Sequence, residues 1–296
     1  MRERNWRNYN KQLVERVSLT FLLSPKIFRE LKAQSPRRGA GRPQEYSNRL
    51  IELLAMVKVH FKMAYRFLEG FSKSFLTKFF PRVKLPTYSL ICKRIASIGA
   101  QLPPLVSQTG GTIVLDATGM KVIGEGEWKV KIHGRGRPRK WIKVHIGIDL
   151  ETQKIVAEVV TESSVGDSKM TKPLLDQVPG RIKRVIADGG YDRSEARDEI
   201  RKKKAKALIP PPKNARYKSS ESERDKAILE IQGFGNNREG RSLWGKLTGY
   251  NRRVLVESAM SRLKRLFGDR FFSKSIESQS VESRIRCLLI NRMCEV

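Results

Sequence analysis

Residues 112–118 read TIVLDAT, a short apolar run without a helical period whose one acidic residue, Asp116, lies near its end. A run of this length and composition predicts a buried strand. Residues 184–188, RVIAD, form a second apolar run, and an aspartate, Asp188, ends it. We therefore expect a sheet in which two buried strands each carry a carboxylate at or near the carboxyl end.

The segments around these two strands alternate between strand and helix patterns. Residues 141–149 and 154–162 alternate in polarity around the turn sequence DLETQ, which predicts a hairpin. Residues 168–178 and 192–206 are expected to be helices, and residues 207–210 a further short strand. This order of elements predicts a mixed α/β fold, with helices flanking a mixed sheet.

Composition divides the chain into regions. Residues 1–45 are basic and end in PRRGAGRP, which predicts an arm and linker. Residues 46–104 contain three short helical patterns with basic residues, which suit either a helix-turn-helix-like DNA-binding domain or an ordinary helical bundle. Residues 105–296 hold the α/β pattern, interrupted at about 210–249 by a Pro-, Gly- and charge-rich insertion or large loop.

The charge balance narrows the partners. Lys and Arg number 60 against 30 Asp and Glu, which gives a formal charge of +30. Such a surface gains by contact with a polyanion, because phosphate contacts release counterions, so nucleic acid is the expected partner. The most apolar segment, residues 50–71, contains too many charges to cross a membrane. Three scattered cysteines and no N-terminal apolar region predict a reduced, cytoplasmic protein.

Asp116 and Asp188 are the first candidates for chemistry. A buried carboxylate is costly unless it is paired or bound to a metal, and α/β sheets place their sites at the carboxyl ends of strands. Gly189 and Gly190 follow Asp188, so the chain can turn sharply there and leave the carboxylate open to a ligand. Each aspartate alone is equally compatible with capping the next turn.

A third carboxylate comes from a helical pattern near the C-terminus. Tyr250, Arg253, Glu257 and Lys264 stand at offsets 0, 3, 7 and 14. At 100° per residue they share one helix face, within an arc of about 60°. The opposite face carries an apolar stripe made of Leu255, Ala259, Leu263 and Leu266. The alternative is a solvated amphipathic helix in which Glu257 only pairs with Arg253.

Glu257 is the preferred third carboxylate over Glu195, Asp198 and Glu199, which lie on a charged helix expected to face solvent. Asp192 is expected to be the N-cap of that helix. Three carboxylates without His or Cys suit Mg²⁺ or Mn²⁺. Two such ions about 4 Å apart would activate a water or a 3′-hydroxyl and stabilise the leaving oxygen, which is the chemistry of phosphodiester hydrolysis and transesterification.

The motifs LDATGMKVIGEGEW and VIADGGYD and the spacing Y-(2)-R-(3)-E-(6)-K resemble those of the DDE transposases of bacterial and archaeal insertion sequences. The resemblance is to the insertion sequence four/five superfamily and, within it, to the insertion sequence five family. It is strongest from about Ile113 to Lys264, and the segments NWRNYN and GRP-Q-EYS extend it over nearly the whole chain.

This resemblance implies a ribonuclease-H-like catalytic domain over residues 105–296. Asp116, Asp188 and Glu257 match the three catalytic carboxylates, which would hold two Mg²⁺ (or Mn²⁺) ions. It also implies a homodimer bound to terminal inverted repeats and target DNA, in the cytoplasm on chromosomal or plasmid DNA.

The same resemblance matches Tyr250, Arg253 and Lys264 to the residues that hold the terminal phosphates of a transposon end. Their chemistry agrees, since arginine offers a bidentate fork for phosphate, lysine a point charge and tyrosine a hydroxyl donor.

Two further features have two interpretations each. Arg135 and Arg137, in the sequence RGRP, resemble the core of an AT-hook that enters a minor groove, but a flexible basic turn that touches phosphates has the same composition. Trp244 could stack on an unpaired base at a cleaved end, or it could be a packing anchor within the insertion.

Three functions are compatible with these features. The leading hypothesis is a metal-dependent transposase that cleaves at inverted repeats and joins 3′ ends to target DNA. The alternatives are a nuclease of the same fold without strand transfer, and a catalytically silent DNA-binding repressor derived from a transposase. The three carboxylates favour the enzymes, because a protein that only binds DNA has no physical need for them.

Overall fold

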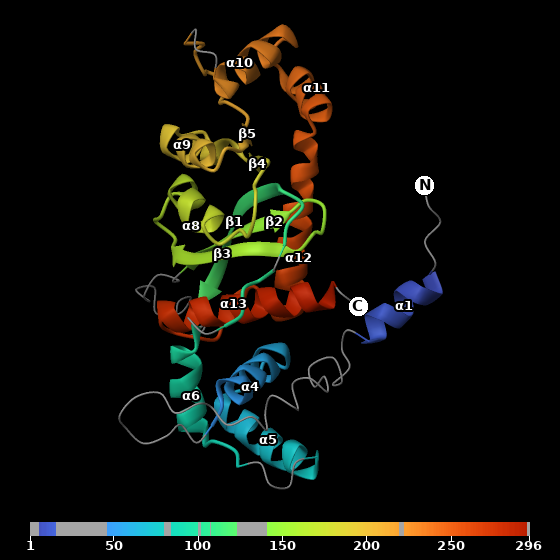
Figure 1. Cartoon of the computed structure of the whole chain (residues 1–296), viewed down its shortest axis with the longest axis vertical. Coiled ribbons are helices and arrows are strands. Elements are labelled where there is room, and N and C mark those ends of the chain that lie inside the picture. The colour runs from blue at the N-terminus through green and yellow to red at the C-terminus, as the bar shows by residue number, and fades with distance from the viewer. Residues whose placement is uncertain are drawn as a thin grey trace, which may run out of the picture. The chain divides into compact units, whose positions relative to one another are not determined.

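The computed structural model describes residues 6–15, 46–79, 84–99, 102–106, 108–122, 141–218 and 222–294. The chain divides into two compact units, Met1–Pro103 with Glu277–Val296, and Pro104–Ile276. The first unit is helical and the second contains the sheet (Figure 1). The last helix thus belongs to the helical unit, and the boundaries of the functional domains stay a prediction.

The helices of the first unit are α1 (Trp6–Glu15), α4 (Asn48–His60), α5 (Tyr65–Phe79), α6 (Tyr88–Ser97) and α13 (Ile276–Met293). Helix α4 begins at the expected place, where the hydroxyl of Ser47 accepts a hydrogen bond from the amide of Leu50 at 3.2 Å. Leu54 of α4 and Ile91 of α6 are buried. Three helices therefore lie where the sequence predicted them, and their contact with DNA stays a prediction.

The strands of the second unit are β1 (Thr112–Val122), β2 (Trp141–Asp149), β3 (Ile155–Glu162), β4 (Arg184–Ala187), β5 (Lys206–Leu208) and β6 (Arg270–Phe271). They form a sheet in the order β3-β2-β1-β4-β5, and β6 pairs with β1. The first three strands are antiparallel, whereas β4 and β5 run parallel to β1. The prediction of a mixed, ribonuclease-H-like sheet is confirmed.

The helices of the second unit are η2 (Asp167–Met170), α8 (Thr171–Leu175), η3 (Gly189–Tyr191), α9 (Ser194–Lys202), α10 (Glu223–Gly233), α11 (Arg238–Thr248), η4 (Tyr250–Arg253) and α12 (Val254–Phe267). On one face of the sheet, Leu115 of β1 packs with Leu174 of α8 and Ile200 of α9. Side chains alternate along a strand, so Asp116 points to the other face. Helix α12 packs against β1 (Figure 1), so Asp116 lies on the face that α12 covers.

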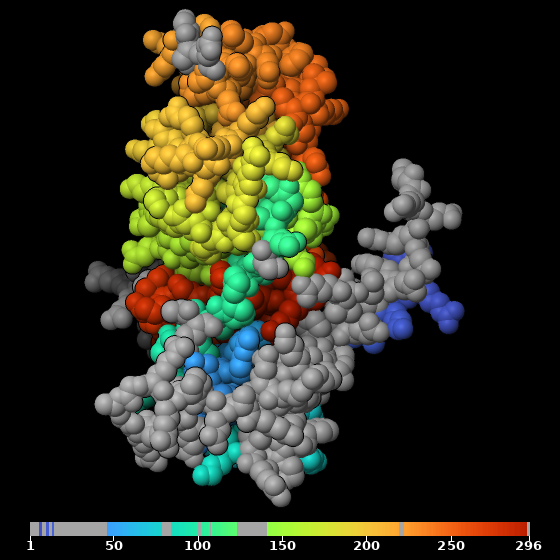
Figure 2. Space-filling view, in the orientation of Figure 1, coloured from blue at the N-terminus to red at the C-terminus, as the bar shows by residue number. Residues whose placement is uncertain are grey.

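The predicted insertion is folded rather than a loop. Helices α10 and α11 form a helical pair around a small core of Ala227, Ile231 and Trp244. Helix α11 ends at Gly249, which takes the left-handed conformation at φ 79°. In the space-filling view the orange atoms of this pair lie next to the yellow atoms of α9 and β5 (Figure 2).

Several elements differ in extent from their predicted ranges. Strand β1 continues to Val122, beyond the apolar run. The helix expected over 192–206 spans only Ser194–Lys202, and Lys204 just after it has a φ of 55°. None of the helices in the described part of the chain is long and apolar enough to cross a membrane.

Candidate active site

The two aspartates predicted at strand ends lie side by side. The parallel pairing of β1 with β4 extends to Leu115 and Ala187, so the residues that follow, Asp116 within β1 and Asp188 just after β4, occupy neighbouring positions on adjacent strands. Oδ1 of Asp188 accepts a hydrogen bond from the amide of Gly190 at 2.9 Å. A Cβ at position 190 would lie 3.0 Å from that oxygen, so this close turn favours glycine.

Glu257 joins the aspartates from α12 through an arginine. Nη1 of Arg253 donates to Oδ2 of Asp116 at 3.0 Å, and Nη2 donates to Oε1 of Glu257 at 2.6 Å. The side chains of Asp116 and Arg253 are 17% and 23% exposed, whereas that of Glu257 is 51% exposed. One guanidinium therefore bridges a largely buried strand carboxylate and an open helix carboxylate.

The carboxylates also affect one another electrostatically. Burial raises the pKa of Asp116 above its ordinary value. The amide of Ala117 and the guanidinium of Arg253 act in the opposite direction, while the negative charges of Asp188 and Glu257 raise the pKa further. The net shift of the Asp116 pKa is upward, and burial is its largest cause.

Tyr250 completes this cluster. Burial raises the pKa of its hydroxyl, Arg253 lowers it, and the charges of Asp188 and Asp116 raise it. Its ring packs against Trp244 with ring centroids 5.5 Å apart. For Arg253, burial lowers the pKa, but the neighbouring Tyr250 and the carboxylates outweigh burial, and the pKa is raised. The guanidinium therefore stays charged.

The predicted helix face is only partly realised. Residues 250–253 form the turn η4, so α12 begins after Arg253. Lys264 lies on α12 seven residues beyond Glu257, about 10 Å along the axis, and does not join the carboxylates. The apolar stripe is also shifted, because Val256, Met260 and Phe267 are buried while Leu266 is 41% exposed. This stripe was predicted at Leu255, Ala259, Leu263 and Leu266, and only Ala259 and Leu263 of these are buried.

The donor atoms suit a hard divalent cation, since all three candidate ligands are carboxylates. Within the described residues, however, no three His, Cys, Asp or Glu side chains lie close enough together to hold a metal ion. The position between Asp116 and Glu257 contains the guanidinium of Arg253. The chemistry of the ligands therefore fits, and their convergence on an ion requires Arg253 to move.

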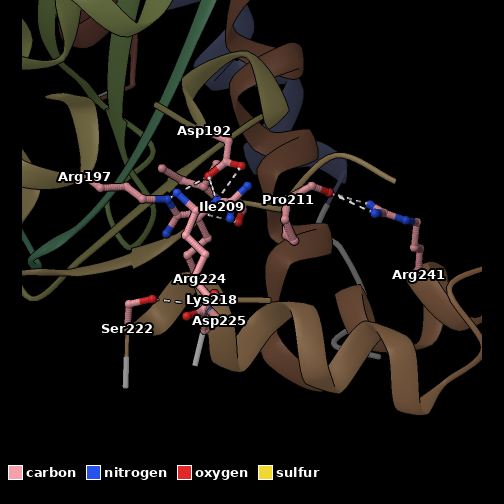
Figure 3. A network of polar contacts seen from close by, with 9 residues as sticks. All are labelled: Asp192, Arg197, Ile209, Pro211, Lys218, Ser222, Arg224, Asp225 and Arg241. Carbon is pink, nitrogen blue, oxygen red and sulfur yellow. Dashed lines mark hydrogen bonds and ion pairs between the residues drawn. The ribbon is translucent and has the colours of Figure 1, made fainter. Parts of the chain in front are cut away.

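A buried ion-pair network lies beside the carboxylates (Figure 3). The carboxylate of Asp192 is 2% exposed and accepts from Nε of Arg197 at 2.8 Å and from Nε of Arg224 at 3.0 Å. Nη2 of Arg197 also donates to the carbonyl of Ile209 at 3.0 Å, which fixes the start of the insertion. The expectation that Asp192 caps α9 is wrong, because the N-cap is Arg193 and Asp192 binds two arginines instead.

A second network lies on strands β2 and β3. His145 is fully buried, with its Nε2 2.8 Å from Oγ1 of Thr161 and its Nδ1 3.7 Å from Oδ1 of Asp167. Lys143 donates to the same aspartate oxygen at 3.1 Å. Burial lowers the pKa of His145 to about 4, Asp167 raises it, and Lys143 lowers it. The imidazole is therefore neutral at physiological pH.

The structure places only some of the remaining predicted residues. Arg135 and Arg137 lie outside the described residues. Trp244 is 2% exposed, and its Nε1 donates to Oε2 of Glu230 at 2.8 Å. A base cannot stack on an indole buried in this way, so the packing role replaces the predicted contact with an unpaired base. On α9, Asp198 and Glu199 pair with cations of their own helix, as expected for a solvated face.

Sequence reasoning missed two long-range ion pairs, one in the candidate site and one beside it. The contact of Arg253 with Asp116 spans 137 residues, and that of Arg224 with Asp192 spans 32, so no local spacing could indicate them. A hint lay in the charge of the segments, because an aspartate directly after ADGGY faces an arginine-rich insertion.

The fold and the site together define a mixed α/β domain in which two adjacent strands and one helix each contribute a carboxylate. Within that class the chain belongs to the family described as "Transposase DDE domain". The sequence pattern of this family matches residues 107–292, and a second pattern with the same description matches residues 14–125.

Three solved structures illustrate how far this likeness extends. The piggyBac transposase synaptic complex with hairpin DNA shares 10% identity over 95% of this chain and 73% of its own, with a TM-score of 0.35. The Mos1 transposase paired-end complex with left transposon end shares 10% identity over 89% of this chain and 85% of its own, with a TM-score of 0.26. A pre-cleavage Mos1 transpososome shares 9% identity over 90% of this chain and 85% of its own, with a TM-score of 0.24. Such low scores do not bear on the details of the site.

Proposed function

We propose that this protein is an insertion-sequence transposase, related to the insertion sequence five family, which binds terminal inverted repeats, cleaves DNA at the element ends and joins the 3′ ends to target DNA. Family membership supports the general activity. The observation that carries the proposal is the contact of Arg253 with both Asp116 and Glu257, beside the position of Asp188 on the neighbouring strand.

The candidate ligands of the metal are Asp116, Asp188 and Glu257. When bound, two Mg²⁺ or Mn²⁺ ions would activate a water or 3′-hydroxyl and stabilise the leaving oxygen of the phosphodiester. Asp188 is held for this role by the amide of Gly190, and Asp116 by the amide of Ala117 at 2.8 Å. These bonds fix one carboxylate within β1 and one just after β4, and strands hold site residues more precisely than loops do.

Arg253 has two partners in turn. In the protein alone its guanidinium neutralises Asp116 and Glu257. A DNA phosphate offers the same bidentate acceptor geometry as a carboxylate, so we propose that the terminal phosphate takes Arg253 from the carboxylates. Tyr250 would donate its hydroxyl to the same phosphate, and Lys264 would meet the duplex further along α12.

The wider assignments are also part of the proposal. The formal charge of +30 supports binding of duplex DNA, both the terminal inverted repeats and the target. The helices α4, α5 and α6 would supply sequence recognition, and the basic Arg135–Arg137 segment would add phosphate contacts. We propose a homodimer on DNA, in the cytoplasm with chromosomal or plasmid DNA.

The test uses duplexes that carry the inverted repeats flanking the coding sequence, together with a target plasmid and Mg²⁺. We expect cleaved ends and joined products from the full chain. Cleavage without joining would support the nuclease, and binding without cleavage the silent repressor, and either would overturn the proposal.

Variants locate the chemistry. Asp116→Ala and Glu257→Gln should abolish cleavage and joining while end binding persists, because their loss removes ligands and not DNA contacts. Asp198→Asn is the matched control, since Asp198 is an exposed carboxylate on α9 that pairs with Arg201 of the same helix. Full joining by Asp116→Ala would show that the metal assignment is wrong.

A further inference from the structure

Besides the candidate active site, the structure contains a cluster of cations at the amino ends of β1, β4 and β5. A hollow of about 440 Å³ opens there, and every residue that lines it is polar. Its lining consists of Thr112, Arg181, Lys183, Arg184, Lys204 and Lys206. We call this cluster the basic pocket. The candidate active site uses none of these residues.

The strands themselves place the central cations of the basic pocket. Thr112 pairs with Arg184 across β1 and β4, and Arg184 pairs with Lys206 across β4 and β5. Paired residues on adjacent strands share a face, so these three side chains form one row across the amino ends of the strands. Arg181 and Lys183 of the preceding loop also line the pocket, and the amide of Lys183 donates to the carbonyl of Gly111 at 2.7 Å, which holds this loop beside the start of β1.

The cations of the basic pocket have no acidic partners in the described structure. Other cations nearby do: on and just after α9, Arg201, Lys202 and Lys203 pair with Asp198, Glu199 and Asp176 respectively. By contrast, no carboxylate among the described residues lies within ion-pair distance of Arg184 or Lys206. Like charges directly opposite each other in a sheet are destabilising, so the row costs stability that an external anion would recover.

The lining also decides the chemical class of the ligand. Sites for drug-sized molecules are lined mainly by apolar and aromatic side chains. Here the lining is five cations and one hydroxyl, all carried by a chain with a formal charge of +30. A row of cations about 5 Å apart along the strand ends suits several phosphates of one polyanion better than a single small anion.

We propose that the basic pocket is a second binding site for the phosphate backbone of duplex DNA, separate from the catalytic carboxylates. Thr112 precedes Asp116 by four residues on β1, so the pocket lies about 13 Å from the carboxylate along the strand. The pocket lies at the amino ends of β1, β4 and β5, whereas Asp116 lies within β1 and Asp188 follows β4. The pocket therefore holds a DNA segment other than the phosphodiester being cut. The inference rests on the proposed function only in taking DNA as the polyanion.

The experiment compares two triple variants of the full chain that each remove three positive charges. The first, Lys183→Gln/Arg184→Gln/Lys206→Gln, empties the basic pocket. The second, Arg201→Gln/Lys202→Gln/Lys203→Gln, removes three cations that already have acidic partners. Binding of a 30-base-pair duplex without inverted repeats is followed by fluorescence anisotropy in EDTA, over a series of salt concentrations.

We expect the pocket variant to bind this duplex about tenfold more weakly at 0.1 M salt, and its plot of log K against log salt to be less steep by about 2 to 3, since each phosphate contact contributes about 0.9. The control variant should lose much less on both measures. Circular dichroism and thermal unfolding establish that both variants are folded. If the triple variant of the pocket is misfolded, the single variant Lys206→Gln replaces it. The slope of log K against log salt should then change by about 1.

Three outcomes would overturn the inference. Equal losses in the two triple variants would show that only net charge matters, and unchanged binding in the pocket variant would show that DNA does not enter. If the pocket substitutions lowered the affinity for pyrophosphate but left the affinity for DNA unchanged, the pocket would be assigned to a small anion. Because the assay contains no metal, failure of cleavage by the unmodified chain would refute the proposed function and leave this measurement intact.

Discussion

Nη1 of Arg253 lies 3.0 Å from Oδ2 of Asp116, a residue 137 positions earlier in the chain. The contact fastens η4, and with it the start of α12, to the central strand of the sheet. It also places a permanent cation at the point where carboxylate-bound metal ions are expected. The same guanidinium reaches Glu257, so a single side chain controls both the shape of the site and its charge.

The first prediction concerns competition between Arg253 and the metal. In Arg253→Gln, Asp116 and Glu257 lose their shared positive partner, so a divalent cation should bind more tightly in the absence of DNA. We expect Mn²⁺ affinity to rise about tenfold, equivalent to about 1.4 kcal/mol. Titration calorimetry or Mn²⁺ electron paramagnetic resonance measures it directly. Joining of cleaved ends should fall in the same variant, because the phosphate contact is lost.

Arg252→Gln is the control for Arg253. Arg252 is the preceding residue in η4, is exposed, and carries the same charge. It should leave Mn²⁺ affinity nearly unchanged. Equal affinities in the two variants would mean that Arg253 does not compete with the ion.

The second prediction concerns Asp192, whose carboxylate is buried against two arginines. Asp192→Asn leaves Arg197 and Arg224 without their anion, and removing one partner of a buried ion pair costs about 3 kcal/mol. The insertion should also become more sensitive to limited proteolysis, because Arg224 ties α10 to the residues after η3 (Figure 3). Chemical denaturation of the full chain measures the loss of unfolding free energy.

Asp198→Asn serves again as the comparison for Asp192, because its side chain is 48% exposed and pairs with Arg201 within one helix. A surface pair of this kind is worth at most about 0.5 kcal/mol. If Asp192→Asn lost no more unfolding free energy than Asp198→Asn, the buried network would not support the fold.

The third prediction separates packing from DNA contact at Trp244. Trp244→Phe removes the hydrogen bond to Glu230 and leaves a gap in the small core of the insertion. We expect a loss of about 1 to 2 kcal/mol in unfolding free energy, with unchanged affinity for a duplex that carries an unpaired base. Trp141→Phe, at a tryptophan that is 41% exposed, should be nearly neutral in stability. A selective loss of affinity for the unpaired base in Trp244→Phe would restore the stacking role.

Much of the fold followed from periodicity. The apolar runs around Asp116 and Asp188 are buried strands, and the hairpin over residues 141–162 forms as predicted. The helices of the predicted insertion were not expected, because α10 has almost no one-sided apolar face: Ala227, Ile228 and Ile231 are its buried apolar residues, and they cover a small core. Its Gly- and Pro-rich flanks then resemble a loop in composition alone.

The candidate site was predictable where its residues sit at strand ends or at regular helical offsets. The sequence could not show that Arg253 would turn toward Asp116, because residues 250–253 leave the α-helical path as η4 and shift the phase of the following helix. Lys264 lies on α12 seven residues beyond Glu257, as its spacing in the sequence predicts, and its contact with DNA stays a prediction.

The last prediction uses the buried imidazole of His145, which faces Asp167, Lys143 and Thr161. Burial lowers its pKa to about 4 in the folded chain, against about 6.5 when unfolded. Between these values the unfolded state binds more protons, so stability is fully present above pH 6.5 and is lost as the pH falls toward 4. The contribution of this residue over that window is about 3 kcal/mol.

His145→Gln should flatten this dependence, because glutamine takes no proton and can still bond to Thr161. The difference in unfolding free energy between the unmodified chain and the variant should therefore shrink as the pH falls from 7 to 4. Taking the difference cancels the opposite contribution of Asp116, whose raised pKa favours the folded state at low pH. Nuclear magnetic resonance gives an independent value, since the imidazole resonance missing from the variant must titrate near pH 4. A resonance that titrates near pH 6.5 would mean that His145 is solvated. Parallel curves of unfolding free energy against pH for the unmodified chain and the variant would mean the same. The packing around His145 would then be looser than the structure shows.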